Sequence, residues 1–568
     1  MIPLIDYRES YFFPLARPRG FTFCNFLTFV LAFVWLENVT GAFKDELKLI
    51  FTILLSYPLA GVLKRLPDAE PGKRNLFMIG VSLFYMVGVF DLWGGLRTLG
   101  VSAGGAYAIA KFVRGPYMPW IAFVYLMGHM LISHIERELH GIPGVVDVTG
   151  AQMVMVMKLT AFCWSVHDGR LPEKDLSAFQ KDRALPVMPG ILNYTAYVLF
   201  FPSLFAGPAF DFAEYQRWID CTMFDVTAPG ATKGSTKRKR KIPKSHRPAI
   251  WKAVCGLGWI FAFMKFSSWY KPEFVLGDEF LGYSVLRRIW YIYALGFAAR
   301  LKYYGVWSLT EGASILSGLG YNGLDENKKP RWDRLTNVDP WALETAENSR
   351  AYLESWNMNT NKWLKNYVYL RVTPRGKKPG FRSSLATFGT SAIWHGISPG
   401  YYLTFLTASL VQTVAKYFRR HIRPFFMEPD GKTPGKHKKA YDIFGLLATQ
   451  IGFSYIVAPF IILDFKNSLI LWGRVKFFVH IGILLSMLFF NSPGKAWLNQ
   501  KLKARIGRPV TSEGLHKSPS ASDFHGGALG LPDDPMKDIV DIQRELLAKK
   551  EAVVVNRRSA VNTANKDK

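Results

Sequence analysis

The sequence predicts an all-α polytopic membrane protein with roughly nine to twelve transmembrane helices. Of its 568 residues, 49% are hydrophobic and 15% are aromatic, and the mean hydropathy lies just above zero. Stretches with few or no charges recur along the chain, and some approach the roughly 20 apolar residues that a helix needs to cross a bilayer. A soluble protein of this length would instead be divided into several charge-studded domains.

Candidate spans can be followed in order along the chain. The clearest apolar stretches are residues 20–36, 49–63, 75–90, 115–135, 184–210, 443–463 and 477–494, and weaker ones lie at 101–110, 152–164, 253–264, 289–299 and 306–319. A further run, between Arg382 and Lys416, contains no Asp, Glu, Lys or Arg. The stretch 325–382 is too polar to cross, because charged side chains are costly in hydrocarbon.

The net charge of +28 is concentrated in the connecting segments. Basic runs at 237–241, at 419–439 and after residue 494 are expected to face the cytosol by the positive-inside rule. We therefore expect an amino-terminal transmembrane bundle (1–226), a basic cytosolic loop (227–249), a carboxy-terminal transmembrane bundle (250–494) and a cytosolic, largely disordered tail (495–568). Nucleic-acid binding is not expected, because no soluble module carries a basic patch interleaved with aromatic residues.

Cysteines and histidines show no metal-site pattern. Four cysteines are scattered without paired spacing and are interpreted as packing residues. Residues 128–140 hold three histidines and two glutamates, but their spacing matches neither HExxH nor the histidine boxes of di-iron enzymes. We expect a solvated loop at the end of a span to contain His134, Glu136, Glu138 and His140. Residues 1–10 carry acidic side chains and no cleavage pattern follows, so no removable signal peptide is expected.

His395 is the first candidate site residue. It stands in the middle of the uncharged run between Arg382 and Lys416, flanked by Trp394 and Gly396. A titratable imidazole is costly to bury in a bilayer, and ionisable groups that occur there are usually functional. The alternative is that it only donates a hydrogen bond to a neighbouring helix.

A second candidate segment lies upstream, at 355–367. On a helical wheel the side chains of Trp356, Thr360 and Trp363 fall on one side, and those of Lys362 and Lys365 fall mostly on the other. That pattern is typical of a helix at a membrane interface. The segment also holds three asparagines, which either bind a ligand or serve as helix caps and turn residues.

These segments resemble the membrane-bound O-acyltransferase family, and within it the lysophospholipid acyltransferases. The resemblance covers residues 20–490 and rests on motifs at 147–152, 158–160, 167–169, 202–208, 214–215, 356–363 and 394–401. Among them are Trp-Asn-x-x-Thr at 356–360 and Trp-His-Gly-x-x-Pro-Gly-Tyr at 394–401. The acidic, tryptophan-rich signature of the sterol and diacylglycerol branch is absent from the sequence.

The resemblance implies a helical bundle with an internal substrate tunnel, and it implies specific site residues. The catalytic histidine of the family falls on His395 and its asparagine on Asn357, with Asn359 as a substitute because residues 373–380 look like an insertion. The implied substrate-binding residues are Trp356, Asn359, Thr360, Trp363, Trp394, Gly396, Lys362 and Lys365. No metal and no cofactor is implied. Acyl-CoA is the implied co-substrate.

The chemistry fits these residue types. A lysophospholipid hydroxyl is a poor nucleophile and needs a base, whereas a thioester already carries a leaving group, because a thiol has a pKa of about 8.5. Burial disfavours a charged imidazolium, so His395 is expected to be neutral and able to take the hydroxyl proton. Asn357 would either orient the nucleophile or donate to the developing oxyanion.

Both substrates have a charged head and an apolar chain. Six basic residues could attract the phosphates of coenzyme A at a cytosolic mouth: Lys362, Lys365, Arg371, Arg375, Lys377 and Lys378. Each of them could equally be an ordinary positive-inside anchor. Gly396 and Gly400 are expected to leave room for an acyl chain beside His395.

We therefore expect a multi-pass endoplasmic-reticulum enzyme that transfers a fatty acyl group from acyl-CoA to a lysophospholipid, with lysophosphatidic acid among the possible acceptors. Its partners would be these substrates and membrane lipids. Two alternatives remain open at this point. One is a protein O-acyltransferase of the same fold. The other is a membrane transporter, which would want paired carboxylates within its spans.

Overall fold

The computed structural model describes residues 33, 37–38, 43–141, 145–224, 242–374, 381–431 and 433–506. Within these ranges the regular structure is helical, and β pairing is limited to two isolated bridges. This confirms the all-α prediction. All of the candidate span at 20–36 except residue 33, most of the basic loop and most of the tail lie outside the described residues.

The amino-terminal helices end before the basic loop. They are α2 (Lys44–Leu63), α3 (Pro71–Leu83), the π-helix η1 (Phe84–Val89), α4 (Trp93–Phe112), α5 (Met118–His140), α6 (Thr149–Asp168), α7 (Ala178–Arg183), α8 (Ile191–Val198), the short η3 (Phe201–Ser203) and α9 (Phe212–Ile219). Nearly all side chains of α6 are buried. Because α4, α5 and α9 pack around it, α6 lies at the centre of this group.

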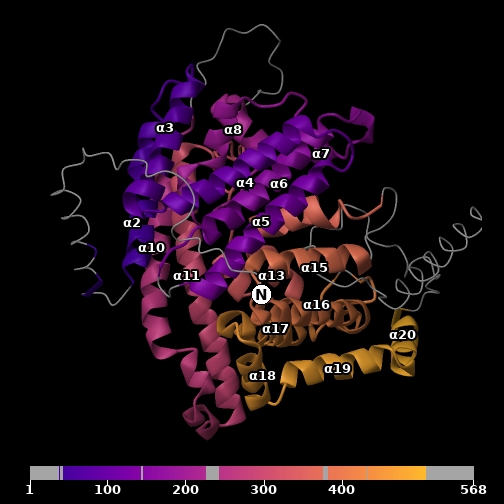
Figure 1. Cartoon of the computed structure of the whole chain (residues 1–568). Coiled ribbons are helices and arrows are strands. Elements are labelled where there is room, and N and C mark those ends of the chain that lie inside the picture. The colour runs from indigo at the N-terminus through magenta and orange to yellow at the C-terminus, as the bar shows by residue number, and fades with distance from the viewer. Residues whose placement is uncertain are drawn as a thin grey trace, which may run out of the picture.

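The carboxy-terminal helices continue the bundle. They are α10 (His246–Trp269), α11 (Val285–Ser317), α12 (Pro340–Glu344), α13 (Ser349–Ser355), α14 (Met358–Trp363), the π-helix η7 (Leu364–Tyr369), α15 (Phe381–His395), α16 (Pro399–Tyr417), α17 (Lys438–Ile462), α18 (Phe465–Arg474), α19 (Phe478–Phe490) and α20 (Pro493–Ile506). Figure 1 shows α15, α16 and α17 side by side, with α5 and α6 on one side of them and α18 and α19 on the other.

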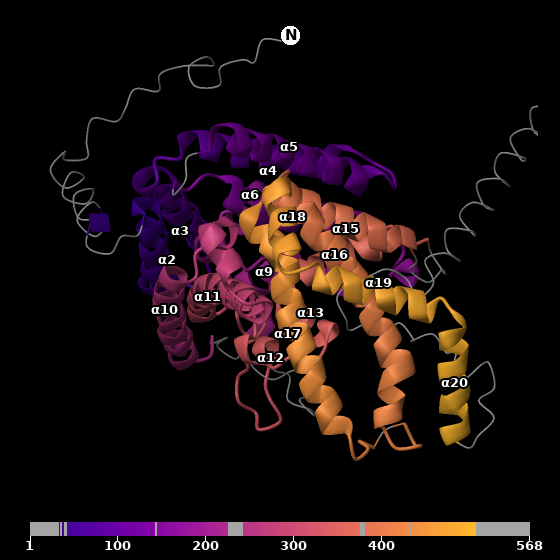
Figure 2. The ribbon, with the colours of Figure 1, turned by 90° about the horizontal axis from the view of Figure 1, so that it is seen from below.

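Several helices are suited to a membrane by length and composition. Among the described residues, α2, α5, α17 and the stretch His246–Leu276 qualify as candidate spans. The pair α18 and α19, bent by 79° at the break visible in Figure 2, would add a fifth if counted as one span. The nine to twelve crossings expected from the sequence therefore remain a prediction.

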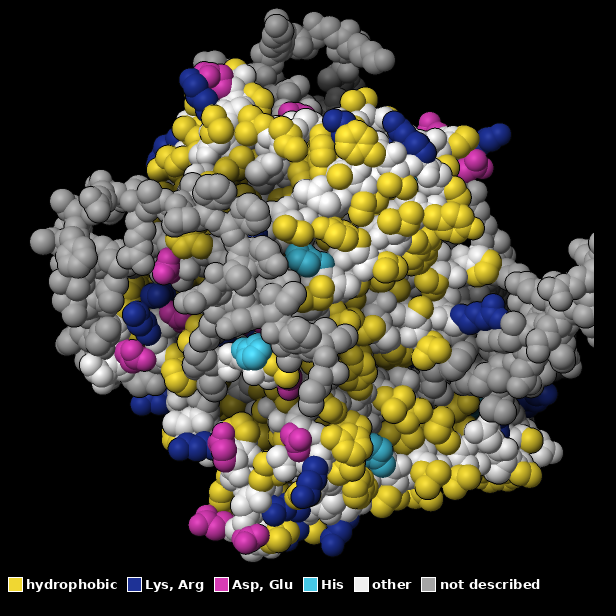
Figure 3. Space-filling model, viewed as in Figure 1, with side chains coloured by type: hydrophobic (Ala, Val, Ile, Leu, Met, Phe, Trp, Pro, Cys, Tyr) yellow, Lys and Arg dark blue, Asp and Glu magenta, His cyan; other side chains and the backbone are white. Residues whose placement is uncertain are grey.

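The outer surface supports a membrane setting. Hydrophobic side chains cover much of the face shown in Figure 3, including the strip formed by α19. On that helix Ile481, Leu484, Leu485 and Leu488 are all exposed. Soluble proteins rarely expose apolar patches of this extent, whereas a lipid-facing helix requires them.

The apolar stretch 184–210 does not form the single spanning helix that we expected. Its main helix, α8, has eight residues, which corresponds to about 12 Å of helix against about 30 Å of hydrocarbon. The side chains of Tyr194, Tyr197 and Phe200 are instead buried inside the protein. The apolar composition of this stretch serves interior packing, and a hydropathy pattern alone does not distinguish the two uses.

The uncharged run around His395 is also divided. α15 ends at His395, and α16 begins at Pro399, in the first-turn position that proline favours. Between them Gly396 adopts φ +137°, a conformation that other residues rarely adopt. His395 therefore lies at a helix end, where the chain turns, and not in the middle of one long span.

Candidate active site

The imidazole of His395 lies in an aromatic surround. The ring of Phe405 from α16 stacks on it at 5.2 Å between centroids, and the ring of Phe460 from α17 meets it edge-on at 4.9 Å. Tyr401 lies 5.7 Å away. The residue is half-buried, and its ring nitrogens have no hydrogen-bond partner among the described residues. An imidazole oriented by packing, with both nitrogens unengaged, can accept a proton from a substrate.

The two glycines beside His395 leave less room than expected. A side-chain carbon on Gly396 would lie 3.1 Å from the ring of Tyr401. One on Gly400 would lie 2.1 Å from the backbone oxygen of Pro459, and the Gly400 N–H donates to the oxygen of Leu463 at 2.7 Å. Gly400 therefore allows close contact with α17. The expectation that it makes room for an acyl chain is wrong.

Asn357 and Asn359 have different surroundings. Asn357 precedes α14 in a left-handed conformation (φ 45°, ψ 52°), which asparagine tolerates better than most residues. Its half-buried side-chain amide has no hydrogen-bond partner among the described residues. The buried amide of Asn359, by contrast, donates to the side-chain oxygen of Asn337 at 3.1 Å and to the backbone oxygen of Leu335 at 3.3 Å. The side-chain amide of Asn359 is thus engaged by the protein itself, in contrast to that of Asn357.

α6 joins the two candidate segments. The indole N–H of Trp394 donates to the backbone oxygen of Met153 at 3.0 Å, and that of Trp363 donates to the hydroxyl of Thr160 at 2.8 Å. Met153 and Thr160 are two turns apart on one face of α6. The rings of Trp363 and Trp394 lie 6.1 Å apart. Both tryptophans were expected in the site from the sequence, and the structure brings them together.

The remaining polar and aromatic residues of the α14 segment are anchored. The Thr360 hydroxyl donates to the sulfur of Met157, which lies on the same face of α6, at 3.3 Å. The indole ring of Trp356 packs against Tyr303 and Trp307 of α11, with centroids 5.5 and 5.0 Å apart. These contacts fix both ends of the turn that carries Asn357.

The structure describes three of the six basic residues that were expected at a cationic mouth. Lys362 is exposed and Lys365 is half-buried, on the opposite side of the segment from the buried Trp363. Arg371 is not available to phosphates, because its guanidinium pairs with the buried carboxylate of Asp168 at 2.8 Å and stacks on Trp164 at 4.2 Å. The other three expected residues, Arg375, Lys377 and Lys378, lie outside the described residues.

The region 128–140 differs from the expected loop. Helix α5 continues to His140, and the side chain of His134 is only 2% exposed. Its Nε2 lies 3.2 Å from the backbone oxygen of Trp394, the residue before His395. The expectation of a solvated position for His134 is therefore wrong, whereas Glu136 and His140 are exposed. Across the described residues no three potential metal ligands converge.

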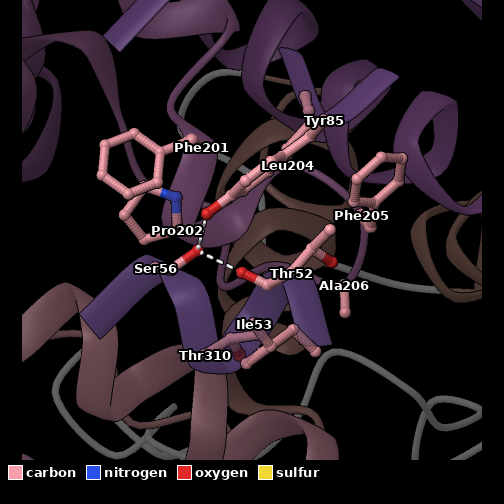
Figure 4. Close-up of a pocket in the computed structure, with 10 residues that line it drawn as sticks. All are labelled: Thr52, Ile53, Ser56, Tyr85, Phe201, Pro202, Leu204, Phe205, Ala206 and Thr310. Atoms are coloured by element: carbon pink, nitrogen blue, oxygen red, sulfur yellow. Dashed lines mark hydrogen bonds between the residues drawn. The ribbon is translucent and has the colours of Figure 1, made fainter. Parts of the chain in front are cut away.

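A small cavity lies apart from these residues. Figure 4 shows it between α2, η1, the η3 region and α11, where the hydroxyl of Ser56 bonds that of Tyr85 at 3.0 Å and the backbone oxygen of Thr52 at 2.8 Å. Its volume is about 10 Å³, enough for about one water molecule. It is too small for an acyl chain, so the substrate tunnel remains a prediction.

Comparison with known proteins decides the family. The family model for membrane-bound O-acyltransferases matches residues 144–458, more than half of the chain, and this range contains both Asn357 and His395. The chain belongs to the membrane-bound O-acyltransferase family. It is therefore an O-acyltransferase, and the transporter alternative has no support.

Relatives of this acyltransferase indicate a branch within the family. The chain is 48% identical over 476 residues to a lysophospholipid acyltransferase of Schizosaccharomyces pombe, covering 84% of this chain and 92% of the relative. It is 44% identical over 508 residues to a lysophospholipid acyltransferase of Saccharomyces cerevisiae, covering 86% and 82%. It is also 32% identical over 403 residues to the human membrane-bound glycerophospholipid O-acyltransferase 2, covering 70% and 75%.

Proposed function

We propose that this enzyme transfers a fatty acyl group from acyl-CoA to the free hydroxyl of a lysophospholipid, with His395 as the general base. The proposal is carried by one observation: the ring nitrogens of His395 have no hydrogen-bond partner among the described residues. His395 also lies inside the region that matches the family model. The substrate class is supported by relatives that bear the name lysophospholipid acyltransferase and match most of the chain.

The transfer needs one base. A ring nitrogen of His395 takes the proton of the lysophospholipid hydroxyl as its oxygen attacks the thioester carbonyl. The tetrahedral intermediate then collapses, the carbon–sulfur bond breaks, and the coenzyme A sulfur leaves with the proton from the imidazolium. The aromatic rings of Phe405 and Phe460 orient the imidazole.

Asn357 supplies a second polar group. Its side-chain amide is uncharged, and its N–H groups have no partner among the described residues. It either donates to the oxygen of the thioester carbonyl, where negative charge develops, or holds the acceptor hydroxyl in line for attack. The contact between Trp363 and Trp394 links its segment to the helix that ends at His395.

The proposed arrangement in the membrane places the substrate path inside the bundle and the basic segments on the cytosolic side. The substrates enter an internal tunnel in a bundle of roughly nine to twelve crossings in the endoplasmic-reticulum membrane. Lys362 and Lys365, on the outer side of the α14 segment, attract the phosphates of coenzyme A. The basic loop at 227–249 and the tail at 495–568 face the cytosol, between and after the two transmembrane bundles.

Membranes containing the enzyme test this proposal directly. Labelled acyl-CoA is offered with a panel of lysophospholipids and with an acceptor peptide, using wild type, His395→Ala and His140→Ala. We expect the wild type to label lysophospholipids and not the peptide. We expect His395→Ala to lose turnover by roughly 10² to 10⁴-fold, the usual worth of a general base, while the protein still accumulates. His140 is exposed, so its variant should match wild type. Near-normal turnover by His395→Ala would refute the mechanism.

A further inference from the structure

The end of α5 lies along the turn that follows His395. His134 contacts the backbone oxygen of Trp394, and the Oε2 of Glu138 accepts a hydrogen bond from the hydroxyl of Ser398 at 2.9 Å. The two residues on α5 are four apart, and so are their two partners. About one helical turn of α5 therefore contacts the chain on both sides of His395 and Gly396, at Trp394 and at Ser398.

The direction of the His134 bond fixes the protonation of its ring. A backbone carbonyl can only accept, so Nε2 carries the hydrogen and donates it to Trp394. This carbonyl belongs to the last turn of α15, where carbonyls have no partner within the helix. Because His134 is buried, water has little access to replace the bond if the imidazole is removed.

The other ring nitrogen faces the same turn. In the neutral ring Nδ1 is an acceptor, and it is buried without a hydrogen-bond partner. It lies 3.7 Å from where a side-chain carbon on Gly396 would stand. A buried polar atom without a partner lowers stability, and this one lies beside the candidate active site. Residue 134 also lies outside the range matched to the family model.

We infer that His134 is a positioning residue for acyl transfer: its Nε2–H holds the carbonyl of Trp394 and thereby sets the orientation of the His395 imidazole. This inference rests on the proposed role of His395 as the base. The ring of His395 is attached at the last residue of α15, where helices fray, so an additional bond to the preceding peptide restricts it. A displacement of about 1 Å at a reacting group can lower a rate by 10²-fold.

Three substitutions test the inference. In His134→Gln the amide N–H can reach the position of Nε2, whereas the shorter side chains of His134→Asn and His134→Ala cannot reach the Trp394 carbonyl. We expect Ala and Asn to lower kcat roughly 10- to 100-fold, in keeping with a misplaced base, while KM for either substrate changes by less than about twofold. Gln should retain kcat within about threefold of wild type, since it restores the donor.

The control variant is measured in the same membrane preparations. His140→Ala, on the same helix and exposed, should leave kcat unchanged. Wild-type kcat in the Ala variant would overturn the inference, and so would a Gln variant as impaired as Asn. If the His134→Ala protein fails to accumulate, the kcat of His134→Gln is compared with that of His134→Asn, and this comparison decides the inference. Activity in His395→Ala would refute the proposed base and, with it, the positioning role of His134. An inactive His395→Ala enzyme beside a His134→Ala enzyme with wild-type kcat would overturn the inference alone.

Discussion

The indole ring of Trp363 lies 6.1 Å from that of Trp394, and each ring donates its N–H to α6. The first ring belongs to the segment that starts at Asn357, and the second precedes His395. The pair therefore connects the two groups that we assign to catalysis. Their relative position depends on α6, a helix that contributes neither of them.

Replacing Trp363 by Phe tests this connection. The ring contact is largely kept, but the hydrogen bond to Thr160 is lost, at a cost of about 1 kcal/mol. We expect kcat to fall and KM to change little, because Asn357 shifts relative to His395. The control is Trp341→Phe, at a position where the side chain is 80% exposed. Equal kinetics for the two variants would contradict the proposed link.

The two asparagines should give opposite results. Asn357→Ala should lower turnover by roughly 10²- to 10³-fold, as removal of an oxyanion donor does, with little change in thermal stability. Asn359→Ala removes the buried amide that donates to Asn337 and to the backbone oxygen of Leu335, and it should cost about 1–3 kcal/mol of stability. Initial rates and heat-inactivation midpoints in detergent measure both effects. A stable, inactive Asn359 variant beside an active Asn357 variant would reverse our assignment.

The pair Arg371–Asp168 should matter for folding. Asp168 is buried, so Arg371→Ala leaves an uncompensated carboxylate and should cost about 3–5 kcal/mol. The matched control is Arg331→Ala, which breaks an exposed pair with Asp333 and should change stability little. Heat-inactivation midpoints compare the two. If Arg371→Ala instead raised KM for acyl-CoA at unchanged stability, Arg371 would bind phosphate after all.

Two glycine substitutions test the packing beside His395. Gly400→Ala places a methyl group against the backbone oxygen of Pro459 and should cost about 1–3 kcal/mol or more, through separation of α16 from α17. Gly389→Ala, in α15, meets open space and should stabilise the protein by up to about 1 kcal/mol. Turnover should fall with Gly400→Ala and not with Gly389→Ala. Thermal midpoints and rates measured on the same preparations check both.

Several helices could be predicted from the sequence, because a run of apolar residues within the helix itself indicates each of them. The apolar runs at 49–63, 115–135 and 443–463 correspond to α2, α5 and α17, since a long apolar segment favours helix in any buried setting. The stretch 184–210 could not be predicted in the same way. Lipid-facing and interior positions have the same composition, and only the packing shows that Tyr197 and Phe200 are covered by protein.

The candidate site likewise contains residues that the sequence predicts and one that only the packing shows. His395 was recognisable because an imidazole in an uncharged run is unusual, and Asn357 because it stands in a motif. His134 was missed, since its neighbours Glu136, Arg137 and Glu138 are charged and suggest a loop. Its partner, Trp394, is 260 residues away along the chain. Only the four-residue spacing of His134 and Glu138 hinted that both lie on one helix face.

The bond between Gly400 and Leu463 has a consequence for biosynthesis. The aromatic surround of His395 includes Phe460, and α16 is held in place by the end of α17. During synthesis the ribosome must therefore pass residue 463 before the imidazole acquires its final surroundings. A nascent chain released before residue 460 would lack both Phe460 and the Leu463 oxygen, so His395 would stand without part of its aromatic surround.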